Sequence, residues 1–136
     1  MQNSDESKRI VLDTYAWIEY FKGTSEGLKA KRYVEGNFEL FTPAIVIAEL
    51  SDKYRRESIE GWPARKSFIK VKTKLLILDD LIADKAGELK QLLRKEHNDA
   101  GLADAIILAH SFQVKGLILT GDKHLRHLKN AIFLGE

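Results

Sequence analysis

The sequence predicts an α/β fold in which a short, mainly parallel sheet is covered by helices on both faces. Short apolar runs alternate with longer stretches whose apolar residues recur at helical spacing, and this alternation is typical of parallel sheets. With 136 residues and 44% hydrophobic content, the chain has the size of one compact domain. We therefore expect a single domain over residues 1–136, with residues 1–8 as a polar tail.

The alternation runs along the whole chain. The first strand, RIVLD, is an apolar run that ends at Asp13, and Pro43 suits the first turn of a helix because that turn needs no N–H from it. The GWP sequence at 61–63 interrupts the chain, and HNDAG at 97–101 is expected to be a loop. We expect strands at residues 9–13, 39–42, 75–78, 116–120 and 131–134, and helices at residues 14–23, 28–34, 43–56, 64–74, 81–96, 102–112 and 123–129.

The composition of the chain says more about the cellular compartment of the protein than about its function. The chain has no cysteine, which excludes disulfides and thiolate zinc sites and favours a reducing cytosol. The polar start, MQNSDESKR, lacks the apolar core of a signal peptide, and no apolar run reaches the roughly 20 residues that span a bilayer. We expect a cytoplasmic protein with no membrane association. The net charge of +2 is compatible with nucleic acid but does not identify it.

Two aspartates stand where strands give way to helices. Asp13 follows the first strand and Asp122 follows the strand at 116–120, so both are expected at the carboxyl edge of the sheet, where ligands bind in such folds. They converge if their strands are neighbours. Each also suits the N-cap of the helix that follows, and capping still leaves a carboxylate oxygen for a cation.

Two further acids fall on apolar helix faces. On a helical wheel, Glu49 lies between Ile45 and Val46, and Asp104 lies in the most apolar helix of the chain. An ionised carboxylate there is costly unless a base or a metal neutralises it. For Glu49 the structural alternative is an ion pair with Lys53, four residues on. For Asp104, the helix dipole explains an acid in the first turn but not one on the apolar face.

Four carboxylates in one cleft would repel one another unless a divalent cation neutralised them, and a metal site explains them most economically. Oxygen-only ligands favour Mg²⁺ or Mn²⁺ over zinc. We expect Asp13, Asp104 and Asp122 to be direct metal ligands, with Glu49 orienting a metal-bound water or completing the second shell.

The stretches VLDTYAWIEYF, AIVIAEL, GLADAIILAHS and LILTGDKHL resemble the successive motifs of PIN-domain nucleases, and more narrowly of the VapC toxins of toxin–antitoxin pairs. The resemblance covers about residues 10–134. It implies a three-layer α/β/α sandwich and a Mg²⁺- or Mn²⁺-dependent endoribonuclease whose acidic quartet is Asp13, Glu49, Asp104 and Asp122. It also implies a cognate antitoxin and a homodimer.

The resemblance assigns supporting roles to neighbours of the quartet. Thr14 and Thr120 match the hydroxyl positions beside the first and last acids. Asp99 is a candidate auxiliary ligand, although a loop residue there more often caps a helix. Two departures, Tyr15 and Leu125, bear on substrate choice and not on the acids.

RNA binding requires cations, and basic residues cluster in several helices. Lys53, Arg55 and Arg56 are the cluster nearest to Glu49 in sequence, and they are able to pair with phosphates or to form an ordinary solvated helix face. Tyr15, Trp17 and Trp62 are able to stack on bases, although Trp17 also suits the core. We interpret His124 and His127, three residues apart, as surface histidines, because no third metal partner is evident.

Three other functions are compatible with the sequence. A signalling domain that is phosphorylated on Asp79 or Asp80 would leave Glu49 and Asp104 unexplained. A PIN-type nuclease of RNA processing or ribosome maturation would share the chemistry but not the toxin role. A catalytically inert PIN scaffold would bind RNA or a partner without cutting.

Overall fold

In the computed structural model, which describes residues 8–135, five parallel strands form one sheet in the order β3-β2-β1-β4-β5. This confirms the predicted α/β class and the parallel sheet. The predicted tail, residues 1–8, lies outside the described residues except for Lys8. The strands are β1 (Arg9–Leu12), β2 (Glu39–Pro43), β3 (Lys74–Leu76), β4 (Leu117–Thr120) and β5 (Ala131–Phe133), and the helices are α2 (Thr14–Lys22), α3 (Ser25–Val34), α4 (Ala44–Arg56), α5 (Trp62–Lys72), α6 (Asp80–Glu96), α7 (Leu102–Val114) and the 3-10 turn η1 (Lys123–Leu125).

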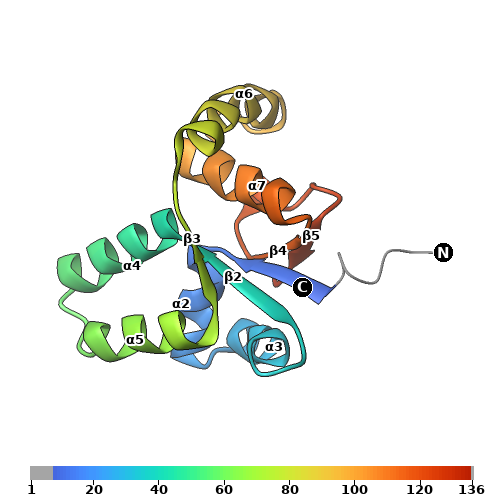
Figure 1. Cartoon of the computed structure of the whole chain (residues 1–136). Coiled ribbons are helices and arrows are strands. Elements are labelled where there is room, and N and C mark those ends of the chain that lie inside the picture. Colours follow the sequence, from blue (N-terminus) through green and yellow to red (C-terminus); the bar gives the residue numbers. More distant parts are fainter. Residues whose placement is uncertain (1–7, 136) are drawn as a thin grey trace.

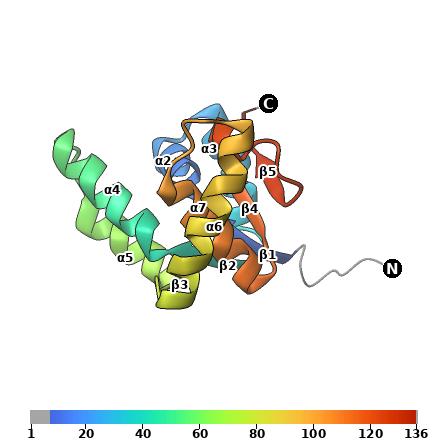
Figure 2. The same cartoon turned by 90° about the horizontal axis from the view of Figure 1, so that it is seen from above.

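The molecule has three layers. Figure 1 shows α6 and α7 on one side of the sheet, and α2, α3 and α5 on the other. Helices α4 and α5 lie side by side and extend away from the sheet in both views (Figures 1 and 2). None of the helices in residues 8–135 combines the length and the apolar character that crossing a bilayer requires.

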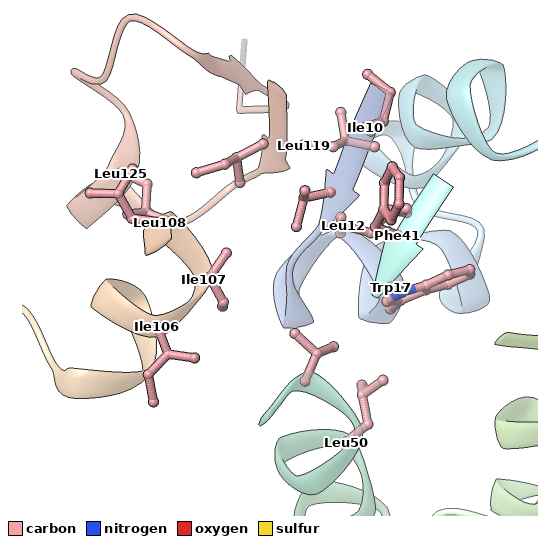
Figure 3. Close-up of a cluster of buried hydrophobic side chains, with 14 of the residues drawn as sticks. Ile10, Leu12, Trp17, Phe41, Leu50, Ile106, Ile107, Leu108, Leu119 and Leu125 are labelled. Atoms are coloured by element: carbon pink, nitrogen blue, oxygen red, sulfur yellow. The ribbon is translucent and has the colours of Figure 1, made fainter. Parts of the chain in front are cut away.

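The core surrounds the central strand. Ile10, Val11 and Leu12 of β1 are fully buried, and Figure 3 shows Leu119 of the neighbouring strand next to Ile10, with Ile107 of α7 in the same cluster of side chains. Helix α7 is buried continuously from Ala105 to Ser111, as expected for a helix that is apolar around its circumference. This packing fixes the helix that carries Asp104.

Several element boundaries differ from the predicted ones for local reasons. Helix α3 begins at Ser25 because the Thr24 hydroxyl accepts a hydrogen bond from the Gly27 amide at 3.0 Å. Pro43 ends β2 in an extended conformation and caps α4, so its expected place in the first helical turn was wrong. The predicted helix at 123–129 is reduced to the short turn η1.

Candidate functional site

Side chains of α2, α4 and α7, together with Asp13 and Asp122 at the carboxyl ends of β1 and β4, line a cavity of about 340 Å³. The four acids singled out from the sequence, Asp13, Glu49, Asp104 and Asp122, all line it. β1 and β4 are adjacent, with Leu12 paired to Leu119, so the condition for convergence of the strand-end aspartates is met. The structure thus gathers the predicted quartet, while the roles of its members as ligands and catalytic groups stay predictions.

Asp13 is the most buried of the four acids. Its side chain is 3% exposed, and its Oδ1 accepts a hydrogen bond from the Ala16 amide at 2.8 Å, so it caps α2 as expected. Burial raises the pKa of Asp13 from 3.8 to about 7, a hydrogen bond with Thr120 opposes this, and the charges of Asp122 and Asp104 add to it. The site therefore disfavours an ionised Asp13 unless a cation is present.

Asp104 and Asp122 form the second part of the cluster. Burial first, and then the neighbouring Asp122, raises the pKa of Asp104 to about 6. Asp104 Oδ2 accepts a hydrogen bond from the Gly101 amide at 3.2 Å. The Asp122 amide donates to the Thr120 hydroxyl at 2.9 Å, so Thr120 links Asp13 and Asp122.

Glu49 enters the cavity from α4. The Thr14 hydroxyl donates a 2.5 Å hydrogen bond to Glu49 Oε1, which gives Thr14 a supporting contact of the kind that was predicted. The alternative partner, Lys53, instead forms an ion pair with Glu57 at 2.8 Å. The structural alternative for Glu49, an ion pair with Lys53, is therefore wrong in this structure.

His124 is a member of the cluster that the sequence interpretation missed. Its Nδ1 lies 3.0 Å from Asp122 Oδ1 and 3.4 Å from Asp104 Oδ2, and its side chain is 18% exposed. The three side chains offer ligand atoms within 4.8 Å of one another, the one such group among residues 8–135. The expectation of a surface histidine was wrong for His124, although His127 is exposed. The spacing of His124, two residues after Asp122, was the available signal.

Asp99 has a different role from the cap that was favoured. Gly101 is the N-cap of α7, and the capping carboxylate is that of Asp104. Asp99 is exposed and accepts a 3.0 Å hydrogen bond from His124 Nε2. That hydrogen bond lowers the pKa of Asp99, and it orients the His124 ring toward the other acids.

The predicted RNA-binding residues are divided between two surfaces. Lys53 and Arg56 line the acidic cavity. Lys53 is paired with Glu57, the C-cap of α4, and Arg56 with Asp52 of the same helix. Arg55 instead lines a separate hollow. The structure therefore brings two of the three cations to the cavity.

The three aromatic residues that were candidates for base stacking lie in different environments. Trp17 is fully buried, as its core interpretation required, and Trp62 is 6% exposed against Tyr54. Tyr15 lines the acidic cavity, and the group hydrogen-bonded to it is Glu26. Only Tyr15 of the three offers a ring to the cavity.

The acids after β3 lie elsewhere. Asp79 caps α6 by accepting from the Ile82 amide at 2.9 Å, and β3 is the edge strand, two strands from β1. Asp80 is exposed at the start of α6. Neither lines the acidic cavity, and nothing about Asp79 or Asp80 favours phosphorylation over simple capping.

Comparison with known proteins identifies the family. A family model described as the PIN domain matches residues 10–131. No curated protein matches the chain.

Solved structures match over nearly the whole chain. A chain of a toxin–antitoxin complex from Klebsiella pneumoniae superposes with a TM-score of 0.73 and 19% identity, covering 92% of this chain and 97% of that one. VapBC-1 from nontypeable Haemophilus influenzae superposes with a TM-score of 0.67 and 17% identity, covering 94% of this chain and 99% of that one. VapC20 from Mycobacterium tuberculosis is described as a toxin that cleaves the sarcin–ricin loop. It superposes with a TM-score of 0.63 and 17% identity, covering 83% of this chain and 91% of that one. At these identities the likeness shows a shared fold.

Proposed function

The chain belongs to the PIN domain family, and on that premise we propose that it is a divalent-cation-dependent endoribonuclease, the toxin of a toxin–antitoxin pair. The observation that carries this proposal is the convergence of four acids on one cavity. Two of them, Asp13 and Asp104, have raised pKa values. A donor set of this kind fits Mg²⁺ or Mn²⁺, which neutralise clustered carboxylates.

Asp13, Asp104 and Asp122 are the residues that would hold the cation. A bound divalent cation lowers the pKa of water and stabilises the charge that develops on the departing oxygen of a phosphodiester. Glu49, held by Thr14, would orient the attacking water from the α4 side of the cavity. Thr120 would keep Asp13 and Asp122 in register through its hydroxyl.

Substrate binding would use the α4 side of the cavity. Lys53 and Arg56 line it, and an RNA phosphate would compete with Glu57 and Asp52 for them. Exposed ion pairs of this type contribute little stability, so their exchange costs little. Tyr15 would offer a ring face to an unstacked base.

The toxin assignment follows the relatives. The Klebsiella and Haemophilus structures are toxin–antitoxin complexes, and VapC20 is described as cleaving the sarcin–ricin loop. By analogy we propose an antitoxin partner, a homodimer and a cytoplasmic RNA target.

The direct test is RNA cleavage by purified protein. Structured and single-stranded RNA are incubated with Mg²⁺, Mn²⁺ or chelator, using wild type, Asp104→Asn and a matched control, Asp84→Asn, whose acid is exposed on α6. We expect cation-dependent cleavage that Asp104→Asn abolishes and Asp84→Asn retains. Cleavage that survives chelation would contradict the metal mechanism.

The biological role needs a second test. Expression in cells should arrest growth, and Asp104→Asn should relieve the arrest. Harmless expression of an active nuclease would instead favour RNA processing, and inactivity with retained RNA binding would favour the inert scaffold.

A further inference from the structure

One imidazole contacts two of the acids that line the cavity, and its surroundings go beyond a simple ion pair. His124 Nδ1 contacts carboxylate oxygens of both Asp122 and Asp104, at 3.0 Å and 3.4 Å. These residues come from η1, the turn before it and α7, so the fold and not local sequence brings the ring to Asp104.

The other ring nitrogen has a partner that sets its direction. His124 Nε2–H donates to Asp99 Oδ1 at 3.0 Å. That contact holds the ring with Nδ1 toward the carboxylates of Asp122 and Asp104. A carboxylate that orients a histidine in this way is the usual outer partner of a metal-ligating imidazole.

The separations suit coordination by one ion. With metal–ligand bonds of about 2.1 Å, adjacent ligand atoms lie about 3.0 Å apart in an octahedral site and about 3.4 Å apart in a tetrahedral one. The distances from His124 Nδ1 to Asp122 and Asp104 are 3.0 Å and 3.4 Å. The ligand atoms of all three side chains lie within 4.8 Å of one another.

The ring is also supported from a third direction. His97, in the segment that links α6 to α7, lies edge-on to the His124 ring at a centroid distance of 5.4 Å. His127 contacts His97 at the same separation but is exposed. The two histidines of the KHLRH segment therefore differ: His124 points into the cluster and His127 lies outside it.

We propose that His124 is a nitrogen ligand of the cation site, oriented by Asp99 and completed by Asp104 and Asp122. This proposal adds a ligand to the cation site of the proposed function. It rests on that function only because both place a cation at the same site. Imidazole favours borderline transition ions, whereas carboxylates alone favour Mg²⁺ and Mn²⁺. The imidazole should therefore add more affinity for Zn²⁺ or Co²⁺ than for Mg²⁺.

The test measures cation binding without RNA. Affinities of the full chain for Co²⁺, Zn²⁺ and Mg²⁺ are determined by calorimetry, and pulsed EPR of the Mn²⁺-loaded wild type reports nitrogen coordination. The variants are His124→Ala, Asp99→Asn and the matched control His127→Ala, with circular dichroism as a check on folding. The EPR measurement needs no variant, so it holds even if His124→Ala does not fold.

We expect ¹⁴N coupling to Mn²⁺ in the wild type. His124→Ala should weaken Co²⁺ and Zn²⁺ binding about 100-fold and change Mg²⁺ binding less than about threefold, with Asp99→Asn losing about tenfold for Co²⁺ and His127→Ala unchanged. Absence of ¹⁴N coupling overturns the proposal. So does a His124→Ala variant that loses all ions equally, or that binds them more tightly because the ring was only a countercharge.

These outcomes separate the two proposals. A protein that shows nitrogen coordination but cleaves no RNA under any cation would refute the nuclease function and leave the His124 site standing. A protein that cleaves RNA but shows no nitrogen coordination would do the reverse.

Discussion

The buried carboxyl group of Asp13 should make the metal-free protein less stable as pH rises. Its pKa is raised from 3.8 to about 7, chiefly because the side chain is removed from water. The folded state therefore holds this proton more tightly than the unfolded chain does. The resulting stabilisation is complete below about pH 4, falls as pH rises toward 7 and is lost above that value.

The size of the effect follows from the shift. A raise of about three pKa units corresponds to about 4 kcal/mol over the full range. Between pH 5 and the folded pKa of about 7, stability is lost over about two pH units. The free energy of unfolding should therefore fall by about 3 kcal/mol between pH 5 and pH 8. The raised pKa of Asp104, about 6, acts in the same direction.

The assay is urea unfolding in chelator at pH values from 5 to 8, comparing wild type with Asp13→Asn. Asparagine caps helices as well as aspartate does, so the variant should keep the hydrogen bond from the Ala16 amide while removing the charge. We expect the stability advantage of the variant over wild type to grow by about 3 kcal/mol between pH 5 and pH 8. Mn²⁺ at 100 times its Kd should add about 2.7 kcal/mol to wild type.

Two results would refute this reasoning. One is a metal-free wild type whose stability is constant or rises between pH 5 and pH 8. The other is an Asp13→Asn variant whose stability relative to wild type does not increase between pH 5 and pH 8. Either would mean that the protein already neutralises the Asp13 carboxylate with its own groups, and the case for a cation would lose its energetic basis.

Three further substitutions probe the supporting contacts. Thr14→Val removes the hydroxyl that donates to Glu49, and should lower the RNA cleavage rate by about tenfold without changing the melting temperature, whereas Thr14→Ser should retain activity. Gly121→Ala places a Cβ 2.1 Å from Tyr15 Cε1, and should cost about 1–3 kcal/mol in urea unfolding, a penalty that a Tyr15→Ala background should remove. Thr42→Val deprives a buried indole N–H of its acceptor, and should cost about 1–3 kcal/mol in the same assay.

The positions of the acids were predictable because they depend on sheet topology. Asp13 and Asp122 follow parallel strands, and such strands end at one edge of the sheet; only their adjacency had to be assumed. Glu49 was identified by its place on an apolar helix face, where an unpaired carboxylate is costly. The structure adds that α4 begins where β2 ends, directly beside β1, and this brings Glu49 to the same edge.

His124 was not predictable by the same reasoning. A regular helix over residues 123–129 would place His124 and His127 on one face, as an exposed pair. The chain instead makes the short turn η1, which separates their directions. Its partner Asp99 lies 25 residues earlier, and no local pattern links a loop acid to a ring that distant. Long-range pairing of this kind is set by how α7 packs on the sheet.

Core packing explains how the fold tolerates clustered carboxylates. Asp104 cannot move away, because Ala105 to Ser111 of its helix are buried, and Asp13 is fixed at the end of a fully buried strand. Packing therefore holds the acids in a place where their ionisation costs stability, and this cost is present only in the folded protein. A cation that binds there recovers that cost as binding free energy. The pH range in which the metal-free protein is least stable should therefore be the range in which it binds its cation most tightly.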